Sequence, residues 1–122
     1  MAFALTSIMA FGQSSVLDNT NNWTSIENID LYSGQHFEDT ISITINQRSV
    51  TLKNDDRVMT FGIENISGTW SDLDSEGQLF FDIPIRDFSG KGIIQNQGGV
   101  LSLTIDLSTR KDGMKKKFII KS

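Results

Sequence analysis

The chain has 122 residues, no cysteine and one histidine, and its 11 basic and 15 acidic residues give a net charge of −4. This length fits one domain that can bury a hydrophobic core without a covalent staple. The lack of cysteine excludes a thiol nucleophile, a Cys-x-x-Cys redox pair and cysteine-held zinc, while the single His36 excludes a multi-histidine metal centre and argues against a histidine-based triad.

The first eleven residues carry no charge and are mostly apolar, and a small-x-small tripeptide, Ala10-Phe11-Gly12, ends this stretch. Such a pattern is typical of a secretory signal peptide, and it is too short to cross a bilayer as a helix. The basic start of a complete signal is missing, so the alternative is an apolar tail or strand packed on the core. We expect residues 1–12 to be a signal-peptide remnant and the protein to be secreted or periplasmic.

Residues 13–25 are rich in serine, asparagine and threonine. This composition predicts a flexible polar leader, because such residues hydrogen-bond locally and offer few side chains to a core. We therefore expect a single β domain over residues 26–122.

Apolar and polar residues alternate with period two through most of that domain, which indicates strands with one buried face. The clearest alternations cover 40–45, 49–53, 59–63, 79–85 and 101–107. Further strands are predicted over 27–32, with Ile29 and Leu31 facing inward, over the glycine-rich segment 88–94, and over 116–121. Pro84 predicts an edge or a bulge in its strand, because proline donates no ladder hydrogen bond.

Short turn sequences separate these strands. They lie at 46–48, 54–56, 71–77, 97–99 and 110–113. Strands joined by short turns predict one antiparallel meander of about eight or nine strands, barrel-like in shape. A two-sheet β-sandwich is the alternative.

The segment Asp72-Leu73-Asp74-Ser75-Glu76-Gly77 resembles the first half of an EF-hand calcium loop, in which alternate oxygens converge on the ion. Asp72, Asp74 and Glu76 are therefore the metal candidates. The twelfth position, Ile83, lacks the bidentate glutamate of that loop. The favoured interpretation is a solvated hairpin tip without metal, and no cofactor is predicted.

Gly68-Thr69-Trp70 is similar to the Gly-x-Trp of lipocalins, a family of eight-stranded barrels that bind small apolar ligands. In that family the motif opens the first barrel strand, whereas here it lies in mid-chain. The favoured alternative is a core tryptophan beside a glycine that relieves crowding.

Six basic residues gather near the end of the sequence, between 110 and 121. The cluster is interpreted as lysines that guard an exposed edge strand rather than as a nucleic-acid surface, because the chain is acidic overall and offers no aromatic platform beside it. No nucleic acid is expected as a partner.

Three functions follow from these patterns. The first is a non-catalytic, exported binding or accessory domain for an unknown small molecule or protein, with Trp70, Phe80 and Tyr32 as contact candidates, since exposed aromatics mark recognition surfaces. The second is an assembly module that pairs through a free strand edge, with the basic C-terminal strand as the candidate edge. The third is a hydrolase that works through paired carboxylates such as Asp82 and Asp106. We favour the first and expect no enzyme activity.

Overall fold

The structure is a computed structural model, and it describes residues 15–85, 88–107 and 114–120. These residues form one short 3₁₀ turn and strands that all pair antiparallel. The elements are η1 (Val16–Asp18), β1 (Asn21–Asp30), β2 (His36–Phe37), β3 (Ile41–Ile45), β4 (Ser49–Lys53), β5 (Val58–Gly62), β6 (Glu64–Thr69), β7 (Gly77–Ile85), β8 (Phe88–Gln97), β9 (Val100–Asp106) and β10 (Lys115–Ile120).

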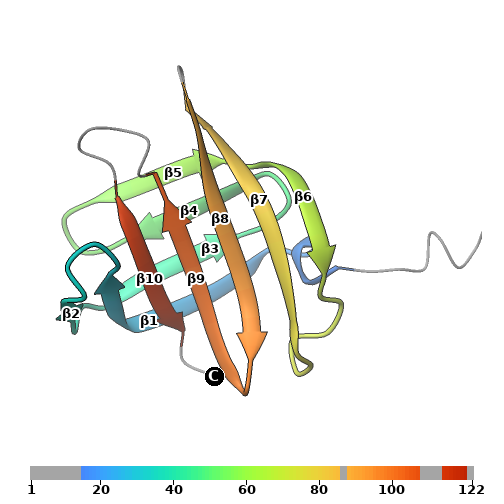
Figure 1. Ribbon diagram of the computed structural model, residues 1–122, viewed down its shortest axis with the longest axis horizontal. Helices are drawn as coiled ribbons and strands as arrows, with labels where there is room; N and C mark the ends of the chain where they lie inside the picture. The colour runs from blue at the N-terminus through green and yellow to red at the C-terminus, as the bar shows by residue number, and fades with distance from the viewer. Residues whose placement is uncertain (1–14, 86–87, 108–113, 121–122) are drawn as a thin grey trace, which may run out of the picture.

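The strands belong to one sheet, in the order β5-β4-β3-β1-β10-β9-β8-β7-β6, and the short β2 pairs with β1 beside this path. The sheet is nearly closed into a barrel, with β1, β3, β4 and β5 running across β6 to β10 (Figure 1). The predicted all-β, barrel-like fold is therefore confirmed, in a single sheet rather than a sandwich.

The closure of the barrel depends on the first and last strands. β1 pairs with β10 from Ser25, opposite Ile120, to Asp30, opposite Lys116. The gap in the barrel falls instead between β5 and β6, which follow each other along the chain and are separated by Ile63. Ile63 is buried and its N–H donates to the carbonyl of Arg48 at 2.9 Å, so it anchors the corner at which the chain leaves one half of the barrel for the other.

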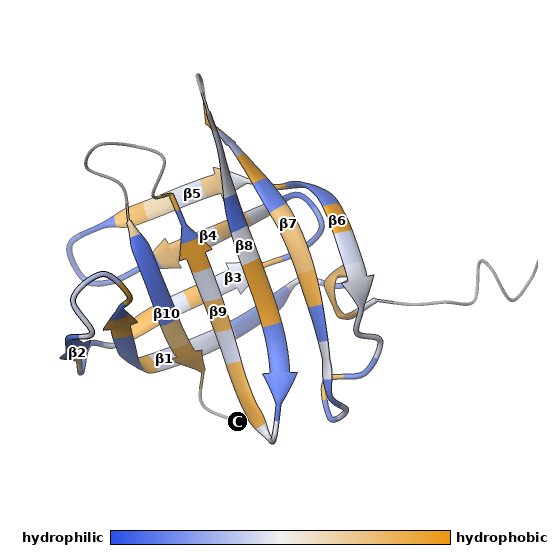
Figure 2. Ribbon diagram, in the orientation of Figure 1, coloured by the Kyte–Doolittle hydropathy of each residue, from blue (hydrophilic) through white to orange (hydrophobic). Residues whose placement is uncertain are grey.

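The alternating apolar residues point into the barrel and form its core, as predicted. Ile43, Ile45, Val50, Ile83, Ile94, Leu103 and Ile105 are all fully buried. Hydrophobic and hydrophilic positions alternate along β9 (Figure 2). Burial of apolar surface, at about 25 cal/mol per Å², is what holds such a barrel together.

The predicted leader is wrong from Ser15 onward. Ser15 caps η1 by accepting a hydrogen bond from the N–H of Leu17 at 3.2 Å, and Asp18 completes the capping box. Val16 and Leu17 are buried in the core, and the N–H of Val16 donates to the carbonyl of Trp70 at 2.9 Å. These two apolar side chains outweigh the polar composition around them, so η1 plugs one end of the barrel beside β6 (Figure 1).

The predicted boundary at residue 26 is also wrong, because β1 begins at Asn21. Its first half pairs with β3, where Trp23 lies opposite Ile43. The polar residues Asn22 and Thr24 on the outer face conceal this strand in the sequence. Residues 1–12, with the predicted signal remnant, lie outside the described residues.

Two of the predicted turns are held by asparagine side chains. The Oδ1 of Asn46 accepts from the N–H groups of Arg48 and Ser49, at 2.8 and 3.1 Å. The Oδ1 of Asn54 accepts in the same way from Asp56 and Arg57, at 2.9 Å each. Both hairpins thus follow from the tendency of asparagine to bond to its own backbone.

The other turns also match where they are described. β6 and β7 flank the loop 71–77, and the turn between β8 and β9 places Gly98 and Gly99 at φ values of 61° and 82°. Two consecutive positive φ angles are the requirement of a tight hairpin turn, which glycine meets without strain. The predicted turn at 110–113 lies outside the described residues.

Proline and glycine act differently in β7 and β8. Pro84 pairs with Ser89 of β8 on one side, while the pairing of β7 with β6 reaches only to Asp82. Pro84 thus lies beyond the β6 pairing, where one side of β7 is free of that strand, a position that suits a residue without an N–H. In β8, a Cβ on Gly92 would collide with the ring of Phe81, so this glycine lets a large core side chain lie against the backbone.

The basic C-terminal strand is not an edge, and this prediction is wrong. β10 lies between β1 and β9, with both of its sides paired over most of its length. In the part of the chain that the structure describes, we find no helix with the length and apolar character needed to cross a membrane.

Candidate functional site

A cavity of about 510 Å³ opens at the end of the barrel away from η1. It lies where β1, β4 and β9 end and where β3, β5 and β10 begin. Its lining is formed by Asn28, Asp39, Ile41, Leu52, Lys53, Asn54, Arg57, Met59, Phe61, Leu107, Met114, Lys116 and Phe118.

The walls of the cavity are apolar and its rim is charged. Seven of the lining residues are aliphatic, aromatic or methionine, and they include the half-buried Met59, Phe61 and Met114. The exposed Asp39, Lys53 and Arg57, together with Lys116, carry charge at the opening. Small-molecule sites have this division between an apolar body and a few placed polar groups.

One buried polar atom lies at the cavity without a partner. Asn28 is only 1 % exposed, and its Oδ1 accepts no hydrogen bond. Burying an unsatisfied amide oxygen costs about 1–3 kcal/mol, and native proteins rarely keep one without a reason. Asn28 therefore marks the cavity as a place where a donor from outside the chain would be favourable.

A β-bulge turns Asn28 inward. The register of β1 against β10 shifts between Ser25 and Glu27, and the Ser25 hydroxyl donates to the carbonyl of Glu27 at 2.9 Å across this irregularity. Before the bulge Ser25 faces the interior, and after it Asn28 does, opposite the buried Phe118. The inserted residue thus changes which side of the strand meets the core.

The same bulge overturns the predicted facing of Ile29 and Leu31. Ile29 lies opposite Lys117 on the outer face, and Leu31 is exposed in the turn that follows. Period-two alternation places both correctly relative to each other, but it cannot register an extra residue upstream.

No known family model matches this chain, and no curated protein or solved structure shows significant similarity to it.

The three predicted aromatic contacts lie in three different places. Trp70 is buried at the plugged end, where its indole N–H donates to the carbonyl of Ser75 at 3.0 Å and its ring lies 6.4 Å from that of Trp23. Phe80 is on the outer face of β7, and Tyr32 is in the exposed turn after β1. The structure brings none of the three to the cavity.

The acidic segment of the β6–β7 loop uses its oxygens to hold turns. The Oδ1 of Asp72 accepts from the N–H of Asp74 at 3.0 Å, and the Oε2 of Glu76 accepts from the N–H of Gly98 at 2.7 Å. Among the described residues no cluster of three or more carboxylates and histidines is arranged to hold a metal ion. Asp72 and Glu76 therefore stabilise the tips of the neighbouring hairpins.

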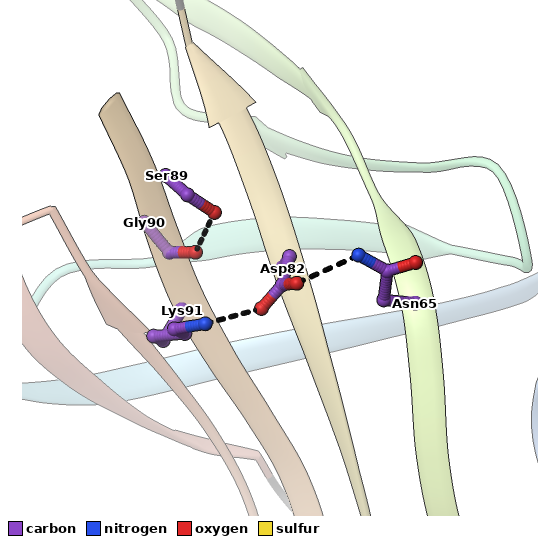
Figure 3. Close-up of polar contacts among 5 residues, drawn as sticks. All are labelled: Asn65, Asp82, Ser89, Gly90 and Lys91. Carbon is purple, nitrogen blue, oxygen red and sulfur yellow. Dashed lines mark hydrogen bonds and ion pairs between the residues drawn. The ribbon is translucent and has the colours of Figure 1, made fainter. Parts of the chain in front are cut away.

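Asp82 and Asp106 lie on the outer face with a lysine between them. Lys91 of β8 is the register partner of Asp82 on β7 and of Asp106 on β9. Its ammonium contacts the Asp82 carboxylate at 2.6 Å, and the Asn65 amide donates to the same carboxylate at 2.8 Å (Figure 3). These two donors hold the pKa of the Asp82 carboxyl below its ordinary value. Neither aspartate lines the cavity.

The local sequence patterns do not indicate that the residues lining the cavity form a group. Met59 and Phe61 appear there as core positions, and Lys116 as one member of a basic cluster. The available signal is a polar residue at an inward position: Lys116 alternates with the buried Phe118 and Ile120 on β10. Strand pairing is needed to show that Asn28 faces the same space.

Proposed function

We propose that this domain is a non-catalytic binding module that holds a small molecule in the open mouth of its barrel. The observation that carries the proposal is the buried, unpartnered Oδ1 of Asn28 at an apolar cavity of about 510 Å³. A volume of about 300–1,000 Å³ suits a drug-sized ligand.

The charged groups at the cavity favour binding over hydrolysis. Among the described residues Asp39 is the one carboxylate in its lining. Carboxylate-based glycoside hydrolysis needs two such groups across a substrate, about 5–10 Å apart. The outer pair, Asp82 and Asp106, flanks the ammonium-bearing Lys91 rather than a cleft.

Titration with decan-1-ol, followed by methyl NMR of the methionines, tests the site. This probe has an apolar body and one hydroxyl donor. We expect saturable shifts of Met59 and Met114, because both line the cavity. The variant Met114→Trp fills the cavity and is expected to abolish the shifts at Met59. Phe80→Trp adds bulk on the outer face and serves as the matched control.

Two results would reject this function: no saturable shift in the native protein, or equal binding by the Met114→Trp variant. Shifts spread evenly over the molecule would also reject it, since they indicate nonspecific adsorption rather than one site.

The proposal includes export, with the binding module acting in a secreted or periplasmic setting. The apolar stretch before Gly12 supports this, and all the described elements follow it in the chain. Sequencing the N-terminus of the protein recovered from outside the cytoplasm tests it. A chain that still begins at Met1 would contradict cleavage after Gly12.

Assembly through strand edges is a second candidate, and the open gap in the barrel favours it. Within the described residues β5 and β6 each pair on one side only, and Val58 of β5 is 61 % exposed. Unpaired edges can add a strand from another chain. Sedimentation at rising concentration tests this: self-association that Val58→Lys removes would support it, and a strictly monomeric protein would count against it.

A further inference from the structure

We propose that the ligand is an anionic amphiphile: a carboxylate at the rim of the cavity, an apolar chain against its walls, and an O–H or N–H group near the carboxylate that donates to Asn28. This inference rests on the proposed function and names the class of ligand that the same cavity takes. A hydroxylated or amide-linked acyl carboxylate has this arrangement of groups.

The charge of the rim points to an anion. Three cationic side chains, Lys53, Arg57 and Lys116, line the cavity against one carboxylate, Asp39, which leaves a net charge of +2. The ion pairs found among the described residues engage none of these four side chains. Among the described residues, the lining of this apolar space thus carries more positive than negative charge, whereas the chain as a whole carries −4.

Lys116 is the cation best placed to meet a headgroup. It lines the cavity, and its ammonium lies 5.2 Å from the centroid of the Phe37 ring, a cation–π contact that favours this position of the side chain. Its strand neighbour Lys117 is the register partner of Thr104 and Ile29 on the outer face. The two lysines therefore form a natural comparison, one on the cavity and one outside it.

Asn28 lies one step deeper than Lys116. Phe118 is the register partner of Asn28 and follows Lys116 by two residues on β10, a rise of about 7 Å. A headgroup at Lys116 thus places the first few atoms of an attached chain near the unpartnered Oδ1. A plain fatty acid would leave that acceptor unpaired, whereas a nearby O–H or N–H would satisfy it.

The acidic residues nearby help to confine an anion to the cavity. A second depression beside it shares Asp39, Lys53 and Asn54 with the cavity, and Glu38, Asp55 and Asp56 are among its other lining residues. These carboxylates repel a negative headgroup from the adjoining surface. They leave the side toward Lys116 and Arg57 as the favourable approach.

Calorimetric titration of the full chain with three probes tests the inference. Decan-1-ol offers a donor without charge, decanoate offers charge without a donor, and 3-hydroxydecanoate offers both. We expect 3-hydroxydecanoate to bind about tenfold more tightly than either of the others, the factor that one satisfied buried acceptor or one charged contact supplies. Affinity for both anions should fall as salt is raised.

Three variants measure how much Asn28 and Lys116 contribute to the binding of the probes. Asn28→Leu should remove the preference for 3-hydroxydecanoate over decanoate, while decanoate itself still binds. Lys116→Gln should weaken both anions about three- to tenfold and leave decan-1-ol unchanged. Lys117→Gln, on the outer face of the same strand, is the matched control and should change nothing.

The outcomes separate this inference from the function beneath it. If decan-1-ol binds as tightly as 3-hydroxydecanoate, or if Lys116→Gln has no more effect than Lys117→Gln, the anionic class is wrong and the cavity remains a binding site. If Asn28→Leu keeps the full preference for the hydroxylated anion, the donor to Asn28 is wrong. If none of the three probes binds, the proposed function itself fails.

Discussion

The two ends of the barrel are formed by the same alternating strands, but one end is filled with side chains and the other holds a cavity. At one end η1 inserts Val16 and Leu17 beside Trp70, and the interior is filled. At the other end β1 and β10 turn Asn28 and Lys116 inward, and a cavity takes the place of packed side chains. The difference lies in a few inward positions, so we expect substitutions at the filled end to lower the free energy of unfolding more than substitutions at the open end.

Truncating a side chain should show this contrast most strongly. Leu17→Ala is expected to lower the free energy of unfolding by about 2–5 kcal/mol, because Leu17 is 1 % exposed and leaves a void under η1. Met114→Ala, beside an existing cavity, should lower it by less than about 1 kcal/mol. Urea unfolding of both variants provides the measurement. Equal losses would show that the ends do not differ.

Backbone crowding should follow the same division. Gly92→Ala is expected to cost about 1–3 kcal/mol, since its new Cβ would meet the ring of Phe81 in the packed interior. The control is Gly62→Ala on β5, where the new atom has only the Arg48 carbonyl nearby, at 3.9 Å. That variant should stay within about 0.5 kcal/mol of the native protein. Thermal unfolding of the pair contradicts the assignment if Gly62→Ala is the more harmful change.

Asn28 and the half-buried Asn96 each carry a buried Oδ1 without a hydrogen-bond partner, but their leucine variants should respond in opposite directions. Asn28→Leu is expected to raise the free energy of unfolding of the unliganded protein by about 1 kcal/mol, because it removes an acceptor without a partner. Asn96→Leu should lower it by about 1 kcal/mol, since the Asn96 amide donates to the carbonyl of Leu73 at 2.9 Å. Denaturant titrations without ligand decide this, and a destabilised Asn28→Leu would mean that the amide stabilises the fold.

The smallest effect concerns the outer face. The pKa of the Asp82 carboxyl lies below its ordinary value of 3.8, owing first to Lys91 and then to Asn65. Its contribution to stability is therefore complete above that value and is lost as the pH falls through the lower pKa of the folded state. Asp82→Asn should flatten this acidic part of the stability profile.

Lys91→Gln should flatten the same part of the profile in part, since Asn65 still donates to Asp82, and the double variant should do no more than Asp82→Asn alone. Unfolding measured from neutral pH down to acid tests both. An unchanged profile in the Lys91→Gln variant would show that the ion pair is not the cause.

The sequence predicted the sheet better than it predicted the site. The alternations through Ile41, Ile43 and Ile45 and the asparagine turns are local properties, and the structure confirms them. The 3₁₀ turn η1 could not be predicted, because two apolar residues in a polar stretch do not indicate a buried element until their packing partner, here Trp70, is known.

The cavity could not be predicted from the sequence for a different reason. It depends on a single inserted residue between Ser25 and Glu27 and on the pairing of β1 with a strand some ninety residues away. The side of a strand that faces the core and the partners of that strand are set by the whole sheet. Local periodicity therefore predicts neither the inward orientation of Asn28 nor the position of β10 between two other strands.

The pairing of β1 with β10 has a consequence for synthesis. β1 gains β3 as a neighbour early in elongation, but its other neighbour begins only at Lys115. Until then a growing chain exposes the free edges of β1 and β9 and cannot complete the barrel, which makes the final closure slow and late. We therefore expect the barrel to close only after β10 has been synthesised.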